Sequence, residues 1–192
     1  MAALPDADAV HALLPQTQCT RCGYAGCRPY AEAIAAGVAD INRCPPGGEA
    51  TLVRLAALTG RPARPIDPEC GMAGPPMVAV IDAARCIGCA RCLPPCPVDA
   101  IVGAQRQLHV VLDDLCTGCE LCIAPCPVDC ITLAPRAAQA PRSPEPAATD
   151  NLRRYDAHRG RRERREAERL ALLAERKARA VRLSTRGSDG AA

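Results

Sequence analysis

Large aromatic side chains are nearly absent from this chain of 192 residues. There are three Tyr, no Phe and no Trp, so aromatic residues make up 2% of the sequence. Since aromatic rings usually contribute much of the buried area of a core, something other than ring packing must hold the fold together. The short length and the 14 cysteines together argue against an ordinary globular enzyme.

Several targeting and catalytic signals are also missing. No stretch approaches the roughly 18 consecutive apolar residues that span a bilayer. The first residues contain Asp6 and Asp8 and lack the basic-then-apolar order of a secretory signal, so we expect a cytoplasmic chain. There is no glycine-rich phosphate loop, Gly-x-Ser-x-Gly motif or nucleotide-binding fingerprint. These absences predict a chain with no catalytic site of its own, which binds neither flavin nor nicotinamide directly.

Cysteine, by contrast, is abundant, with 14 residues in the chain. In a reducing cytoplasm, regularly spaced cysteines are more often metal ligands than a disulfide framework. Histidine is scarce, and His11, His109 and His158 are isolated in the sequence. His109 alternates with apolar residues as in a strand, and we expect all three to be structural.

Eight of the cysteines form an internal repeat of about 30 residues. Their companions repeat as well, for example Gly88 with Gly118 and Pro97 with Pro127. The two quartets are Cys86, Cys89, Cys92 and Cys96, followed by Cys116, Cys119, Cys122 and Cys126. This part of the chain is therefore a duplicated unit.

Each quartet has the spacing C-x2-C-x2-C-x3-C-P, which is that of bacterial ferredoxins. Three thiolates from one tight loop reach three corners of a [4Fe-4S] cubane, whereas the fourth is placed to reach the other cubane. We therefore expect one cluster on Cys86, Cys89, Cys92 and Cys126, and another on Cys116, Cys119, Cys122 and Cys96. A pair of structural zinc sites is the alternative, although zinc ribbons usually bring two separate C-x2-C knuckles.

A third quartet precedes the repeat, with the spacing C-x2-C-x4-C-x16-C. Its members are Cys19, Cys22, Cys27 and Cys44. Four cysteines in so short a stretch suit either one zinc ion or one cubane. The set contains no histidine, which favours an all-thiolate site without choosing the metal.

The apolar runs, glycines and prolines predict an α+β protein in five segments. These are a helical four-cysteine module over residues 1–60, a Pro-rich linker over 61–76, a two-cluster ferredoxin module over 77–134, a second Pro-rich linker over 135–148, and an Arg-rich charged helix with a disordered tail over 149–192.

Short elements are expected within these segments. Helices are predicted over 30–36 and 51–58, strands over 78–81, 101–102, 110–112 and 131–133, and a brief helix between the third and fourth cysteine of each repeat. The repeats would then be two β-α-β units packed as a pair. Asp150 is available as the N-cap of the final helix.

The charge of the chain is divided unevenly. Residues 1–140 carry 10 Arg against 13 Asp and Glu, while residues 141–192 carry 14 Arg and Lys against 8 Asp and Glu. A solvated helix is the simplest interpretation of the basic tail. Peripheral contact with an anionic membrane surface or an acidic partner is the alternative. Nucleic-acid binding is not expected, because the tail has almost no aromatic residues for stacking.

Four further residues stand out in or near the repeat. Cys130 occupies the place of Ala100 in the other repeat, so we expect a small buried apolar filler. Cys70 lies in the linker and is predicted to be a free thiol. Asp99 and Asp129 follow Cys-Pro-Val at equivalent positions, where loop-capping hydrogen bonds are expected.

Three stretches together resemble the B subunit of the bacterial Rnf (Rsx) electron-transport complex. They are residues 13–37, which read LLPQTQCTRCGYAGCRPYAEAIAAG, followed by CPPGG at 44–48; MVAVID at 77–82; and the two ferredoxin repeats. The resemblance runs from about residue 8 to residue 133. A four-cysteine helical module followed by a two-cluster ferredoxin is a specific combination.

The resemblance implies a third [4Fe-4S] cluster, on Cys19, Cys22, Cys27 and Cys44. It also implies electron transfer through three clusters, with redox protein partners that include the other subunits of a membrane-associated complex. Family members usually begin with a membrane-spanning anchor, whereas this sequence begins almost directly at the first module. We therefore expect a cytoplasmic form, at most peripheral on the cytoplasmic face of the inner membrane. A free ferredoxin serving another oxidoreductase and a zinc-stabilised interaction protein are the alternatives.

Overall fold

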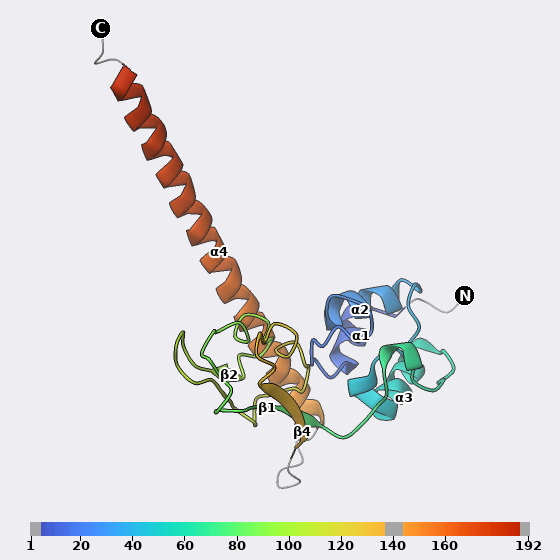
Figure 1. The fold of residues 1–192 in the computed structure, drawn as a ribbon. Helices are drawn as coiled ribbons and strands as arrows, with labels where there is room; N and C mark the ends of the chain where they lie inside the picture. The colour runs from blue at the N-terminus through green and yellow to red at the C-terminus, as the bar shows by residue number, and fades with distance from the viewer. Residues whose placement is uncertain (1–4, 137–143, 189–192) are drawn as a thin grey trace. The chain divides into compact units, whose positions relative to one another are not determined.

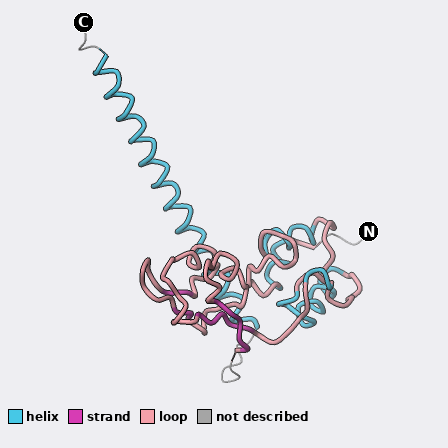
Figure 2. Tube along the Cα trace, in the orientation of Figure 1, coloured by secondary structure: helices cyan, strands magenta, loops and turns pink. Residues whose placement is uncertain are grey.

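A computed structural model describes residues 5–136 and 144–188 of the chain. The chain divides into two compact units, Met1–Tyr155 and Asp156–Ala192. All the cysteines belong to the first unit. Figure 1 shows the helices and strands along the chain, and Figure 2 separates them from the long loops that carry most of the cysteines.

The first part of this unit is helical, as the sequence predicts. It contains α1 (Ala7–Leu13), α2 (Cys27–Ala35), the short 3-10 helix η1 (Pro45–Gly47) and α3 (Gly48–Thr59). Helix α3 ends at Gly60, whose left-handed φ of 68° permits a C-terminal cap that a side chain would disfavour. The buried core is small and consists mainly of Val10, Leu14, Tyr30, Ile34, Leu52 and Leu55.

The linker predicted after α3 remains attached to the helical part through its first ten residues. The side-chain N–H of Asn42 donates to the Pro65 carbonyl at 2.8 Å. The backbone carbonyl of Asn42 accepts from the Asp67 N–H at 3.0 Å. Arg43 pairs with the Asp67 carboxylate at 2.8 Å. The 3-10 helix η2 (Pro68–Cys70) follows, and Cys70 is buried.

Four short strands follow, and each pairs with a strand of the other repeat. They are β1 (Met77–Ile81), β2 (Ile101–Val102), β3 (Val110–Val111) and β4 (Ile131–Pro135). Strand β1 pairs antiparallel with β4, with Ala79 opposite Leu133, and β2 pairs antiparallel with β3. The duplication thus forms one interlocked body with two small sheets.

The brief helix predicted between the third and fourth cysteine of each repeat is wrong. Both segments are turns, in which Cys96 N–H donates to Leu93 and Cys126 N–H donates to Ile123. Pro95 and Pro125 have no N–H to continue a helical ladder, and the segments are shorter than one α-helical turn. The repeats are therefore not β-α-β units, although the α+β class is confirmed.

Two equivalent glycines allow the repeats to interlock. A methyl group on Gly118 would lie 2.5 Å from the Met77 carbonyl oxygen, and one on Gly88 would lie 2.8 Å from the backbone of Gln107. Met77 and Gln107 are themselves 30 residues apart. The two halves therefore contact each other through the same close approach, as expected for a pseudo-twofold pair.

The last element is the long helix α4 (Pro144–Ser188). It begins earlier than predicted, so Asp150 lies inside the helix and the prediction that it is the N-cap is wrong. Proline is tolerated in the first turn of a helix, where its missing N–H has no partner to lose. Residues 162–180 are exposed throughout. No helix in the described part of the chain is long and apolar enough to cross a membrane.

Candidate metal centres

The four cysteines of the first quartet, here called centre 1, surround one hollow of about 280 Å³. Cys22, Cys27 and Cys44 are buried, and Cys19 is partly exposed. The rest of the lining is mostly apolar or backbone, and includes Leu14 and Tyr30. Centre 1 is therefore a largely buried hollow that presents four thiols and no carboxylate.

Two buried glutamines shape the loop that leads into centre 1. Gln18 accepts a hydrogen bond from the Cys27 N–H at 2.9 Å, so its side chain caps the start of α2. Gln18 also donates to the Gln16 side chain at 2.9 Å, and Gln16 donates to the His11 carbonyl at 2.6 Å. Both have positive φ, 57° for Gln16 and 55° for Gln18. Neither was predicted from the sequence, where the only signal is a run of polar residues directly before Cys19.

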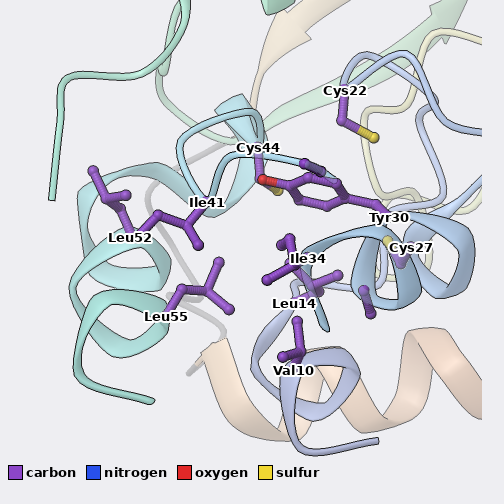
Figure 3. Packing of buried hydrophobic residues seen from close by; sticks show 12 residues of the cluster. Val10, Leu14, Cys22, Cys27, Tyr30, Ile34, Ile41, Cys44, Leu52 and Leu55 are labelled. Carbon is purple, nitrogen blue, oxygen red and sulfur yellow. The ribbon is translucent and has the colours of Figure 1, made fainter. Parts of the chain in front are cut away.

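Tyr30 lies among the sulfurs of centre 1, with Cys22, Cys27 and Cys44 around it (Figure 3). Its hydroxyl donates to the Asp40 carbonyl at 2.8 Å and accepts from the Arg43 N–H at 3.1 Å. Burial raises the pKa of this hydroxyl, so it remains protonated. Tyr30 thereby joins α2 to the segment that carries Cys44.

A second hollow, of about 320 Å³, lies in the ferredoxin-like part. Among its lining residues are Cys116, Cys119, Cys122 and Cys96, here called centre 3. Cys96 comes from the first repeat and the other three from the second. The structure therefore brings together the crossed set that the spacing predicts.

The remaining quartet, Cys86, Cys89, Cys92 and Cys126, is here called centre 2. Burial is the main cause that raises the pKa of Cys92 to about 11. Smaller contributions come from the neighbouring thiols of Cys89, Cys86 and Cys126. The fourth cysteine again comes from the other repeat. The same crossing therefore brings the centre 2 residues close to one another.

Backbone N–H groups point at the sulfurs in both halves. Ala100 N–H donates to Cys96 at 3.2 Å, and the equivalent Cys130 N–H donates to Cys126 at 3.4 Å. Ala79 N–H, on β1, donates to Cys116 at 3.4 Å. Such donors stabilise a sulfur that carries negative charge, as the sulfur of a metal-bound thiolate does.

Several cysteines of these centres are weaker acids than a free thiol before any metal binds. Burial raises the pKa of Cys27 and of Cys122 to about 12, and that of Cys119 to about 11. Metal ligation requires thiolates, so binding must displace these protons. The donor set fits a metal that binds sulfur strongly enough to do so.

No three His, Cys, Asp or Glu side chains in residues 5–136 and 147–180 converge closely enough to hold one metal ion. A cubane does not need that convergence, because its four thiolates are ligands of a cluster rather than of one ion. Four thiols around a hollow, with N–H groups aimed at the sulfurs, fit the needs of a [4Fe-4S] cluster.

The other residues singled out in the sequence lie in or near these centres. Cys70 is buried, and the nearby Arg43 guanidinium partly offsets the rise that burial causes in its pKa. Asp99 and Asp129 adopt left-handed backbone conformations, with φ of 49° and 46°. Cys130 is buried as predicted, but its sulfur lies 3.5 Å from that of Cys126. His109 is buried beside Cys86.

Two protein-family comparisons match the two cysteine modules separately. The family described as "4Fe-4S dicluster domain" matches residues 79–133, which include centres 2 and 3. The family described as "Putative Fe-S cluster" matches residues 14–46, which include centre 1. Both matches indicate iron–sulfur clusters in these parts of the chain.

Several curated relatives are named as the B subunit of an ion-translocating oxidoreductase complex. The protein of Alkalilimnicola ehrlichii is 62% identical over 109 residues, which are 56% of this chain and 59% of the relative. That of an Azoarcus species is 61% identical over 111 residues, 58% of this chain and 61% of the relative. That of Thiobacillus denitrificans is 57% identical over 110 residues, 57% and 58% of the two chains.

The chain spans about three fifths of the length of these relatives. At 57–62% identity the matched residues share a common fold and ancestry with them. The resemblance expected from the cysteine motifs is thus confirmed: over some 110 residues this chain, which carries a 4Fe-4S dicluster domain, is a homologue of the B subunits of ion-translocating oxidoreductase complexes.

Proposed function

We propose that this chain transfers electrons through three [4Fe-4S] clusters, as part of an ion-translocating oxidoreductase complex. The observation that carries the proposal is the crossed arrangement of centre 3. Cys96 leaves its own repeat to join Cys116, Cys119 and Cys122 around one hollow. A two-cluster ferredoxin needs this arrangement, whereas separate zinc knuckles do not.

Each proposed cluster has four cysteine ligands. They would be Cys19, Cys22, Cys27 and Cys44 in centre 1; Cys86, Cys89, Cys92 and Cys126 in centre 2; and Cys96, Cys116, Cys119 and Cys122 in centre 3. The family described for residues 14–46 and the four cysteines that line the first hollow support the assignment of centre 1.

A bound [4Fe-4S] cluster supplies one-electron reduction and oxidation. The residues of this chain hold it, exclude water and tune it. Backbone N–H groups of Ala79, Ala100 and Cys130 stabilise the sulfurs to which they donate. Apolar neighbours such as Val98 and Ile101 keep the ferredoxin-like part dry. The described residues thus fit the binding and tuning of clusters.

The name of the relatives points to redox proteins as partners, among them the other subunits of such a complex. The basic part of α4 offers a second, peripheral contact. Residues 156–180 contain nine Arg and Lys against five Asp and Glu, and most are exposed. A helix of this charge is attracted to anionic headgroups. We infer that it places the chain against the cytoplasmic face of the membrane.

Electron counting tests the proposed chemistry. Purified holoprotein is reduced anaerobically with measured additions of a low-potential reductant, while the absorbance near ~400 nm is followed. Three one-electron centres predict an uptake of about three electrons per chain. A colourless protein that takes up none would contradict the proposal.

Co-purification tests the proposed complex. A tagged chain is recovered from gently solubilised membranes, and its companions are identified. Membrane redox subunits that co-purify in fixed proportion are the expected result. Recovery of the chain alone from the soluble fraction would instead identify a free ferredoxin.

A further inference from the structure

The internal symmetry makes centres 2 and 3 near copies of each other, so any difference between them is informative. Residues 30 positions apart occupy equivalent places, as the close approaches of Gly88 and Gly118 show. Two buried positions beside the sulfurs do not match. One holds Ala79 in the first repeat and His109 in the second; the other holds Ala100 and Cys130.

Both polar members of these pairs lie at centre 2, because the repeats are interlocked. The Nδ1 of His109 lies 3.8 Å from the sulfur of Cys86, and the sulfur of Cys130 lies 3.5 Å from that of Cys126. At centre 3 the equivalent residues, Ala79 and Ala100, contact Cys116 and Cys96 through their backbone N–H groups. Their methyl side chains can donate no hydrogen bond.

A metal-bound cysteine sulfur can only accept hydrogen bonds, which fixes the direction of both contacts. With Cys126 as a ligand, the thiol of Cys130 is the donor. The imidazole of His109 must likewise carry its proton on Nδ1. Its Nε2 is buried and faces no acceptor within the described residues. A proton on Nε2 would therefore make no hydrogen bond there.

Two coupled residue differences between the repeats make room for the imidazole. Ala79 on β1 lies opposite the bulky Leu133 of β4. The equivalent residue of Leu133 is Gly103, and a methyl group there would lie 2.4 Å from the Cδ2 of His109. The first sheet therefore has a small residue facing a large one, and Gly103 and His109, directly beyond the ends of β2 and β3, form the reverse combination. His109 has a site that fits its ring.

We propose that His109 and Cys130 are positioning residues that give centre 2 a higher reduction potential than centre 3. The inference rests on the proposed function, because it requires clusters at both centres. Reduction adds negative charge to the cluster and its sulfurs, so a hydrogen-bond donor stabilises the reduced form more than the oxidised form. Both donors are buried, with exposed fractions of 3% and 5%, so bulk water does not compete with them for the sulfurs.

Redox titration of the holoprotein, followed by electron paramagnetic resonance, tests this inference. His109→Ala and Cys130→Ala each install the residue type that the other repeat has. Each should make the potential of one ferredoxin-like centre more negative, and the double variant should bring the two potentials closer together. Ala100→Cys is the reciprocal change, and it should make the potential of the other centre less negative.

Cys130→Ser distinguishes hydrogen bonding from packing. Serine keeps a donor at this position, so the potential should stay closer to that of the unmodified chain than it does in Cys130→Ala. Potentials that remain unchanged in His109→Ala, Cys130→Ala and their double variant would overturn the inference. A shift of the same size for Cys130→Ser and Cys130→Ala would also overturn the role of the thiol.

Metal analysis of the same samples separates this failure from failure of the proposed function. About 12 Fe per chain with unchanged potentials would reject the inference alone. Zinc in place of iron in the unmodified chain would reject the proposed function, and the inference with it.

Discussion

Arg21, between the first two cysteines of centre 1, forms an ion pair with Glu120, which directly follows Cys119 of centre 3. A second contact joins the same two loops, because the Thr117 hydroxyl donates to the Thr17 carbonyl at 3.4 Å. Centre 1 is thereby held next to centre 3 within the first unit. Glu120 stands where the first repeat has Ala90, so the repeat symmetry is broken at this contact.

Glu120→Gln should loosen this contact with little loss of stability. The two side chains are 34% and 38% exposed, and partly exposed pairs contribute about 1 kcal/mol or less. Hydrogen exchange should become faster in the loops around residues 17–22 and 117–120. Asp8→Asn, which removes the exposed pair of Arg28 with Asp8, is the matched control. Equal exchange rates in both loops for Glu120→Gln and for the unmodified chain would show that the pair does not hold them together.

Serine substitutions should reveal the crossed ligation. Cys96→Ser removes a proposed ligand of centre 3. The electron paramagnetic resonance spectrum of this variant should therefore lose the same signal as the spectrum of Cys116→Ser. Cys126→Ser should instead match Cys86→Ser. Each variant should lose about four Fe if the altered cluster is lost. Cys70→Ser, outside the proposed centres, should keep its iron content. A match between Cys96→Ser and Cys86→Ser would place both in one centre and refute the crossing.

Gly118→Ala should weaken the ferredoxin-like part. The added methyl would lie 2.5 Å from the Met77 carbonyl oxygen, and the backbone has a φ of +66° that alanine disfavours. A cost of about 2 kcal/mol or more is expected, measured as faster loss of the ~400 nm absorbance in denaturant. Gly74→Ala is the control, because its methyl would meet no atom within 4 Å. Equal rates for the two variants would contradict the close packing of the repeats.

Tyr30→Phe should weaken centre 1 and spare the other two. The change leaves the Asp40 carbonyl and the Arg43 N–H without their partner, at a cost of about 1–3 kcal/mol. Iron should be lost first from centre 1 when the protein is warmed with a chelator. Tyr24→Phe should have a smaller effect. It removes the hydroxyl of a neighbouring ring whose centroid lies 5.5 Å from that of Tyr30. Uniform iron loss from all centres would argue against a local role of Tyr30.

Vesicle binding tests the basic part of α4. The full chain should sediment with vesicles that contain anionic lipid, and less so at high salt, because screening weakens charge attraction. A chain ending at Tyr155 keeps the contact between Asn151 and the Pro15 carbonyl but lacks the basic part. It should stay in the supernatant. Equal sedimentation of both chains would reject a membrane contact through this helix.

The sequence was most informative where the chemistry is local. The spacing of Cys86, Cys89 and Cys92 reflects one tight loop, and Gly60 marks a helix end by itself. Strand pairing depends on partners far apart in the chain, and strands as short as Ile101–Val102 carry too little pattern to identify theirs. The pairing of the repeats with each other therefore could not be predicted from the apolar runs.

Side-chain roles that need three dimensions were also beyond the sequence. Gln18 caps α2 from nine residues away, with a left-handed backbone that no propensity favours. The sequence shows that Cys130 replaces Ala100, but not that its thiol lies against Cys126. His109 was expected to be a structural residue. Only the interlocked repeats place it beside Cys86 rather than near the cysteines of its own repeat.

Iron, zinc and acid-labile sulfide in the purified holoprotein test the central claim most directly. Three centres with four thiols each predict about 12 Fe and an equal amount of sulfide per chain, with no stoichiometric zinc. About eight Fe per chain would show that centre 1 does not hold the cluster proposed for it. Zinc bound in the absence of sulfide would contradict electron transfer by this chain altogether.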